Sequence, residues 1–502
     1  MSEDERRLLD SALSGSLEAN LAAINHVFHS PRNSSLVIRR FSLGRRNGGL
    51  KAALVFLDDI VDTAAIRDTI LKALFRIEGA GLPGARLQDT IVRSVPGAIV
   101  LRALAYSEVV SGLVEGSTVL LVDGARWALL WDTRSIEHRA IGESPAEAIV
   151  RGPHTGFVED QRTNLALIRL HLATPDLVCE RTHVGARSNV PFAIVYLEGV
   201  ANPKLVREVK RRVSSVKADF VPSADMLKSF IEDQPNSPLP SVLVTERPDR
   251  VAGMLAEGHV AIVSPSAGVA VVPVTIWDLM HSPEDYYLHY IPASTVRLIR
   301  WLALFTTVYS SALYVAVTNY HPEMIPTELL SVIASAREAV PFPAVLEVVT
   351  MEVALELIRE ASVRIPATFG PTIGVVGAVV LGQAAVMANL VNPILVVVVA
   401  ISGLGAFAVP NYELGVVLRL TKFIMIFAAS IAGAPAVTAV TVVLLARLCV
   451  SYSFGVPVTA PVIPHREHSP DTFLRGPVWA MERRPGQLHP ANSRRQAGRS
   501  RS

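Results

Sequence analysis

Cysteine is scarce throughout this chain, and charge is missing from long parts of it. Only Cys179 and Cys449 occur in 502 residues, which excludes a fold built on a disulfide framework. Acidic and basic residues are absent from residues 301–322, 365–412 and 423–446, and the mean hydropathy of the chain is +0.38. A membrane-spanning helix needs about 20 apolar residues. These stretches therefore predict membrane spans and exclude an ordinary soluble protein.

An apolar leader is lacking as well. The chain begins MSEDERRLLD, which is charged, and no apolar run follows it. We therefore expect no cleavable secretory signal, and we expect the N-terminal half to stay in the cytoplasm.

Recognisable catalytic and ligand-binding motifs are also missing. Gly48 and Gly49 precede a predicted strand, but the Lys-Ser/Thr of a phosphate loop and the spacing of a dinucleotide fingerprint are not there. No pair of nucleophile and base, and no metal-ligating cluster, stands out from the background. We therefore expect no enzyme, no cofactor, no metal and no nucleic-acid partner.

The N-terminal half contains a repeat. LKAALVFLDDIVDTAAIRDTILKAL, from Leu50, and NVPFAIVYLEGVANPKLVREVKRRV, from Asn189, both read as an apolar strand, an acidic turn and an amphipathic helix. Val55 aligns with Val195, and further on each copy has a second helix and two strands about a turn. The preserved order and spacing predict two α/β subdomains, each a strand, helix, helix, hairpin unit.

Acidic residues follow the first strand of each copy and could be taken for metal ligands or general acids. They are Asp58, Asp59, Asp62 and Glu198. Acidic residues between a strand and a helix favour the turn and the helix N-terminus, where the helix dipole stabilises negative charge. We favour that structural interpretation and predict no catalytic pair.

The segment between the copies predicts a linker helix. Leu165, Ile168 and Leu172 fall on one helical face, although alternation at its C-terminal end would also suit a short strand. We expect its charged residues, among them Arg162 and Arg169, to be solvated, and a subunit contact is the alternative.

The C-terminal half predicts an all-α polytopic membrane domain with four or six crossings. Arg297 and Arg300 precede the first apolar block and the tail is rich in arginine, so both termini are expected in the cytoplasm. Gly433 and Pro435 predict either a break between two helices or a kink in one. Four glycines are candidates for close helix packing, namely Gly370, Gly374, Gly377 and Gly382.

One apolar helix, PFPAVLEVVTMEVALELIREASVRIP from Pro341, carries charge at helical spacing. Its charged residues are Glu347, Glu352, Glu356, Arg359, Glu360 and Arg364. Three interpretations stay open: a helix on the membrane surface, the lining of a water-filled pathway, and a buried salt-bridge core. For the second, the candidate pathway-lining residues are Glu347, Glu352, Glu356 and Glu360.

The same region resembles the GerA spore germination family. The similarity runs through YHPEMIPTELLSVIASAREAV and this charged helix, and continues through SPEDYY, GPTIGVVGAVVLGQAA, PNYELGVVLRL, RTNLALIR and VYLEGVANPKLV, from about Ser35 to Arg495. Pro371 departs from the Gly-Gln-Thr-Ile-Gly that the family commonly has, so a role of that glutamine does not transfer. The tail DTFLRGPVWAMERRP resembles the receptor A subunits more than the related SpoVAF branch.

The resemblance implies an A subunit of a nutrient germinant receptor in the inner membrane of an endospore. Its implied partners are a transporter-like B subunit, a lipoprotein C subunit, further A subunits in a homo-oligomer, and membrane lipids. The implied activity is ion release on activation, and a non-conducting scaffold or signal relay is the alternative. A secondary transporter ranks low, because no repeat is visible in the membrane half.

The expected organisation has six parts. They are an N-terminal extension (1–34), a first cytoplasmic α/β subdomain (35–150), the linker helix (151–188), a second cytoplasmic α/β subdomain (189–292), a helical membrane domain (293–455) and a basic cytoplasmic tail (456–502).

Overall fold

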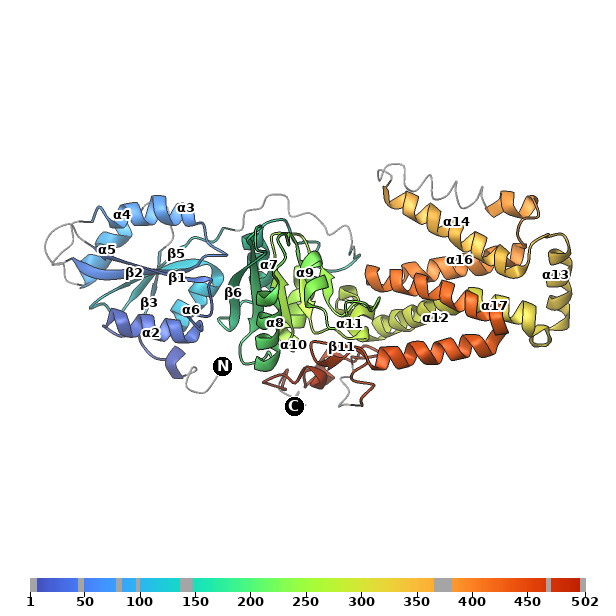
Figure 1. Cartoon of the computed structure of the whole chain (residues 1–502). Helices are drawn as coiled ribbons and strands as arrows, with labels where there is room; N and C mark the ends of the chain where they lie inside the picture. The colour runs from blue at the N-terminus through green and yellow to red at the C-terminus, as the bar shows by residue number, and fades with distance from the viewer. Residues whose placement is uncertain are drawn as a thin grey trace.

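The computed structural model describes residues 7–43, 49–77, 84–95, 100–135, 147, 149–364, 382–465 and 471–496. Figure 1 shows two units of sheet and helix in a row, followed by a bundle of long helices. The C-terminal residues return from the bundle to the second sheet-and-helix unit.

The first unit is built on a five-stranded sheet of order β1-β2-β4-β5-β3, in which all neighbouring strands are antiparallel. Its strands are β1 (Leu36–Leu43), β2 (Leu50–Leu57), β3 (Val100–Ala103), β4 (Ser117–Val122) and β5 (Ala128–Asp132). Its helices are α2 (Leu17–Val27), α3 (Thr63–Ala65), the π-helical η1 (Ile66–Leu71), α4 (Lys72–Leu74), α5 (Gly84–Ser94) and α6 (Tyr106–Glu115).

The second unit has the same architecture, with strand order β6-β7-β9-β10-β8 and antiparallel neighbours. Its strands are β6 (Leu177–Val184), β7 (Val190–Leu197), β8 (Leu243–Thr245), β9 (Val260–Val263) and β10 (Val269–Val272). Its helices are α7 (Gln161–His171), α8 (Pro203–Ser215), α9 (Ala224–Ile231), α10 (Pro248–Glu257) and α11 (Ile276–Met280). Two units of one α/β architecture are what the sequence repeat predicts.

Helices cover both faces of the second sheet. Ala193 and Val195 of β7 pack with α7 and α10, whereas Phe192, Ile194 and Tyr196 pack with α8 and α9. Successive side chains of a strand point to opposite faces, so a sheet that is covered on both sides needs apolar residues at every position. The uninterrupted apolar run of β7 is explained by this three-layer packing.

Equivalent residues of the two copies occupy equivalent places. Val55 and Val195 are each the sixth residue of the second strand of their sheet. Helices α6 and α10 end at Glu115 and Glu257, and each is followed by a glycine in the left-handed region, at φ 98° and 111°. Such a glycine ends a helix at little steric cost because it has no Cβ.

The segment between the copies contains α7, and this helix has the same place in its copy that α2 has in the first. The side chain of Asn20 bonds both the N–H and the C=O of Ser14, at 2.9 and 2.8 Å. Asn164 makes the same two bonds with Val158, at 2.8 and 2.6 Å. Since α7 packs on the second sheet, this helix belongs to the core of the second unit.

The acidic turns have structural roles, as predicted, but not all are local. Asp62 caps α3 by accepting from two backbone N–H groups. Asp58 instead bonds Arg162 and Arg181 of the second unit, at 3.0 and 3.1 Å. The expectation that Arg169 is solvated is wrong, because its side chain is 1% exposed and pairs with Asp59.

Two strands of each sheet were not anticipated by the repeat. β1 and β6 carry charged residues in their middle, such as Arg39 and Glu180, because the middle of each strand is partly exposed. β3 and β8 are only four and three residues long. Apolar patterning is weak in such edge strands.

The helix bundle contains five described helices of twelve residues or more. They are α12 (Tyr290–Tyr320), α13 (Thr327–Glu338), α14 (Ala344–Arg364), α16 (Pro393–Phe407) and α17 (Tyr412–Cys449). Single turns η2 (Pro283–Tyr286) and η3 (Pro322–Met324) flank α12, and the short hairpin β11 (Tyr452–Ser453) and β12 (Val456–Pro457) follows α17, with η4 (Val478–Ala480) and η5 (Gly486–Leu488) in the tail.

Helix α17 is two helices joined by a sharp reversal, so the chain has a break here and not a kink within one helix. Ala432 and Gly433 have non-helical backbone angles, and Gly433 has φ 64°. Pro435 cannot donate a backbone hydrogen bond, which favours a helix start there. The two halves run back along each other (Figure 1), and Gly433 lies against Tyr320 at the far end of α12.

By length and composition, two described helices could cross a membrane, Tyr290–Tyr320 and Tyr412–Ala432. Two shorter apolar helices, Pro393–Phe407 and Ala434–Cys449, run beside them. Large apolar side chains on these helices are exposed in the single chain, including Phe305, Leu404 and Ile431. A surface of this kind suits lipid or another subunit rather than water.

Candidate functional site

The charged helix α14 crosses the bundle from its far end to the second α/β unit. The first residues of α14 lie by the start of α16, where the Asn392 N–H donates to Glu347, and its last turns lie by the second unit. The four glutamates that were predicted to line a pathway consequently occupy three environments. Glu347 and Glu352 are buried, Glu356 is half-buried and Glu360 is exposed.

Glu352 forms a closed ion pair inside the bundle. Lys422 Nζ of α17 lies 2.5 Å from Glu352 Oε2, and both side chains are 0% exposed. Ser311 of α12 donates to the other oxygen at 2.5 Å. A carboxylate at the bilayer centre costs about 2.5 kcal/mol or more unless it is paired. The cation that Glu352 requires is therefore Lys422, and the triad ties α12, α14 and α17 together.

Glu347 is buried without such a partner. It is 2% exposed, and Oε2 accepts the backbone N–H of Asn392 at 3.1 Å. Its other oxygen, Oε1, has no hydrogen-bond partner among the described residues. One helix thus carries two buried carboxylates, of which one is neutralised by a lysine.

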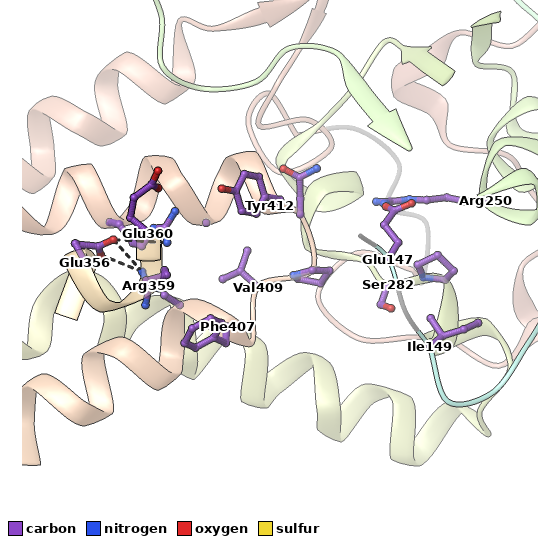
Figure 2. Close-up of a pocket in the computed structure, with 16 residues that line it drawn as sticks. Glu147, Ile149, Arg250, Ser282, Glu356, Arg359, Glu360, Phe407, Val409 and Tyr412 are labelled. Carbon is purple, nitrogen blue, oxygen red and sulfur yellow. Dashed lines mark hydrogen bonds and ion pairs between the residues drawn. The ribbon is translucent and has the colours of Figure 1, made fainter. Parts of the chain in front are cut away.

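Glu356 and Glu360 line a cavity of about 430 Å³ where the bundle meets the second α/β unit. Figure 2 shows Glu356, Arg359 and Glu360 on one side and Glu147, Arg250 and Ser282 on the other. Phe407, Val409 and Tyr412, at the turn between α16 and α17, complete the wall between them.

The charges in this cavity are paired on each wall. Arg359 lies 3.0 Å from Glu356 and rests on the ring of Phe407, with 4.6 Å from the guanidinium carbon to the ring centroid. Arg419 approaches the same carboxylate at 3.7 Å. Across the cavity, Arg250 binds Glu147 at 2.6 Å. Three arginines and three glutamates give a polar, near-neutral chamber that suits hydrated ions better than an apolar ligand.

A second set of charges holds the start of α12. Asp285 accepts from Arg297 at 2.9 Å and from Arg300 at 2.7 Å, and Arg297 also binds Asp471 of the tail at 2.6 Å. Burial disfavours charge on Asp285, but the hydrogen bonds and charges of Arg300 and Arg297 outweigh it and lower the pKa of that carboxyl. Arg297 and Arg300, whose positive charge predicts the orientation of the first span, are thus also structural ion-pair partners.

The tail packs along the second unit. Phe473 contacts the ring of Trp277 with centroids 4.5 Å apart, and Arg484 donates to the carbonyl of Ala256 at 2.7 Å. Arg495 lies 3.3 Å from Glu257 beside a cavity of about 290 Å³. Burial raises the pKa of Glu257 to about 7, although the charge of Arg495 opposes the rise.

Sequence reasoning missed Lys422, Ser311, Asp471 and Glu147. Lys422 carried a usable signal, because it borders the charge-free block 423–446 and a lysine at membrane depth calls for a carboxylate. The partner was not visible, since it lies 70 residues away along the chain. The sequence around Asp471 and Glu147 has no pattern that marks either residue as an ion-pair partner.

Only one of the four predicted packing glycines is described. Gly382 lies against Val396 of α16, whereas Gly370, Gly374 and Gly377 lie outside the described residues. Among the described glycines of the bundle, the tightest approach is at Gly405 of α16, where an added Cβ would come within 2.6 Å of Thr307 Oγ1 and 2.7 Å of the Ala303 carbonyl oxygen, both of α12.

Comparison with known proteins shows similarity to spore germination proteins along nearly the whole chain. A family described as Bacillus/Clostridium GerA spore germination protein matches residues 22–487. Spore germination protein KA of Bacillus subtilis (strain 168) is 35% identical over 496 residues, which cover 98% of this chain and 90% of that protein. Spore germination protein GerLA of Bacillus cereus is 32% identical over 483 residues, or 96% and 97%.

Two further similarities are notable. The uncharacterized membrane protein YfkQ of Bacillus subtilis (strain 168) is 35% identical over 494 residues, which cover 98% of this chain and 94% of YfkQ. A crystal structure of the N-terminal domain of the A subunit of the Bacillus megaterium spore germinant receptor GerK3 is 31% identical. It covers 52% of this chain and 96% of that domain, with a TM-score of 0.42.

Proposed function

Because the chain belongs to the GerA spore germination protein family, we propose that it is the A subunit of a nutrient germinant receptor and that it forms or gates an ion-release pathway. The observation that carries the pathway is the course of α14. Its charged face runs from the buried Glu347 and Glu352 to Glu356 and Glu360, which border the chamber at the second α/β unit.

We infer six passages of the chain through the membrane. α12 leaves the second unit and α14 returns to it, so Arg364 ends on the side of that unit. Asn392 lies at the far end beside Glu347. The charge-free stretch 365–412 is long enough for two passages, so we place one of them between Arg364 and Asn392. α16 returns, and the two halves of α17 go out and back, ending at β11, where Ser453 bonds the carbonyl of Ser241. An even number of passages leaves the α/β units and the tail on one side.

That side is the cytoplasm in this proposal. The arguments are the arginines at the start of α12 and the basic tail, since positive charge is retained on the cytoplasmic side. The membrane is then the endospore inner membrane, and the partners are a transporter-like B subunit, a lipoprotein C subunit and further A subunits. Exposed apolar side chains of the bundle supply the surface for both lipid and subunits.

A non-conducting scaffold or signal relay is the second candidate. The closed triad of Glu352, Lys422 and Ser311 favours it, because charges that neutralise each other within one chain do not need a water-filled path. A secondary transporter has less support, since the duplication of the α/β units has no counterpart in the described bundle.

Reconstitution separates the two leading candidates. Liposomes that contain the assembled receptor should release potassium or sodium when germinant is added, and Glu356→Gln or Glu360→Gln should change the rate or the selectivity. Asp68→Asn is the matched control, because Asp68 is an exposed carboxylate in the first unit that pairs with Arg67 and Lys72. Ion flux that stays unaltered in both glutamate variants, with assembly intact, favours the scaffold.

A further inference from the structure

The two buried glutamates of α14 differ in one respect that has a chemical consequence. Glu352 has Lys422 at 2.5 Å, whereas no described cationic side chain lies within ion-pair distance of Glu347. An uncompensated carboxylate in a bundle interior is strongly disfavoured, so the group is either protonated or held against a positive partner.

The undescribed part of the bundle cannot supply that partner. Residues 365–381 contain no lysine, arginine or histidine. Among the described groups, Arg337 of α13 acts on Glu347 only at a distance, and its guanidinium lies 3.5 Å from Asn319 Oδ1. When Glu347 is ionised, its positive partner therefore comes from outside the chain's own bundle.

Polar groups beside Glu347 are also left without partners. Tyr314 of α12 is 9% exposed, the charge of Glu347 acts on it, and its hydroxyl has no hydrogen-bond partner among the described residues. Asn392 is fully buried, and its side-chain Nδ2 has no partner there either. Meanwhile its backbone N–H fixes one carboxylate oxygen and leaves Oε1 available.

We propose that Glu347, Tyr314 and Asn392 form a binding site for a monovalent inorganic cation at the far end of the bundle. The carboxylate Oε1 and the tyrosine hydroxyl supply oxygen ligands, and the asparagine amide holds an accompanying water. One carboxylate balances one positive charge, whereas divalent ions in proteins take six or more oxygens, several of them charged. The site rests on the proposed membrane placement of the bundle, but it stands whether or not the chain conducts.

Cation-dependent stability of the purified full-length chain tests the site. Chloride salts of lithium, sodium, potassium and rubidium are exchanged for N-methylglucamine chloride at constant ionic strength, and unfolding is followed by tryptophan fluorescence. A cation that binds the folded chain raises its Tm in a saturable way. We expect wild type to respond to one or two of these ions, Glu347→Gln to lose the response, and Tyr314→Phe to need a several-fold higher concentration.

Asp68→Asn is the matched control, because Asp68 is an exposed carboxylate of the first unit that pairs with Arg67 and Lys72, and it should keep the wild-type response. Equilibrium binding of radioactive sodium and rubidium to the wild-type chain provides a measurement that does not depend on a variant folding. Absence of saturable binding, or a response that survives in Glu347→Gln, overturns the site. If Glu356→Gln loses ion flux but keeps cation binding, the result bears on the proposed ion pathway and leaves this cation site unaffected.

Discussion

Arg169 of α7 and Asp59, after β2, form an ion pair that is closed to solvent between the two α/β units. Arg169 Nε lies 3.0 Å from Asp59 Oδ2, and the two side chains are 1% and 0% exposed. The pair joins the second copy to the turn of the first, and the partly exposed Asp58 reinforces it through Arg162 and Arg181.

Removing either partner of this pair should strongly destabilise the contact between the units. Asp59→Asn or Arg169→Met leaves the other charge buried, at a cost of about 3–5 kcal/mol. The double variant Asp59→Leu with Arg169→Met should lose less than either single change, because no buried charge remains. Thermal unfolding of the full-length chain measures this, and Arg40→Met, in an exposed pair with Glu18, should shift Tm little. Single variants as stable as this control would contradict the prediction.

The pair of Glu352 and Lys422 should behave in the same way inside the bundle. Lys422→Met alone leaves Glu352 uncompensated and should reduce the yield of folded protein in membranes, whereas Lys422→Met combined with Glu352→Gln should recover most of it. Quantitative size-exclusion chromatography in detergent reports the folded fraction. Equal yields for the single and double variants would show that the two charges are not coupled.

Cysteine labelling tests the inferred passages. In a chain without Cys179 and Cys449, Glu323→Cys lies beyond the far end of α12, and Ser215→Cys lies on the exposed end of α8. An impermeant maleimide added to intact cells that express the chain should label the first and reach the second only after permeabilisation. Labelling of Ser215→Cys in intact cells would overturn the orientation.

The packing of the tail should depend on pH through Glu257. Its pKa is about 7 in the folded chain against an ordinary value of 4.5. The folded state therefore holds this proton more tightly than the unfolded state. Its contribution to stability is complete below about pH 4.5 and is lost as the pH rises through 7. Tm of wild type should fall across this window, and Glu257→Gln should remove that part of the fall.

Arg495→Gln provides the sign control for the same carboxylate. Because the charge of Arg495 lowers the pKa of Glu257, its removal should move the fall in Tm to higher pH. If the fall in Tm moved to lower pH, or if the profile matched that of wild type, Arg495 of the tail would not be lowering the pKa of Glu257.

Local patterns in the sequence determined which elements this protein has. The repeat about Val55 and Val195 anticipated that the two units share one α/β architecture, because apolar strands, turn acids and helix-ending glycines are encoded within a few residues of each other. Gly433 and Pro435 likewise marked the place of the reversal in α17, although the sequence left open whether the helix breaks or kinks there. The edge strands β1 and β6 were not predicted, since their partly exposed middles carry charges that interrupt the apolar pattern.

Only the tertiary structure decided which charges meet. Glu347 and Glu352 are both glutamates of one apolar helix, yet Lys422, which is 70 residues away along the chain, neutralises Glu352 alone. Arg169 looks like a solvated side chain until packing of α7 on the second sheet brings it against Asp59. Helix propensity and amphipathic patterning depend on near neighbours, whereas the cost of a buried charge depends on what the fold places within a few ångströms of it.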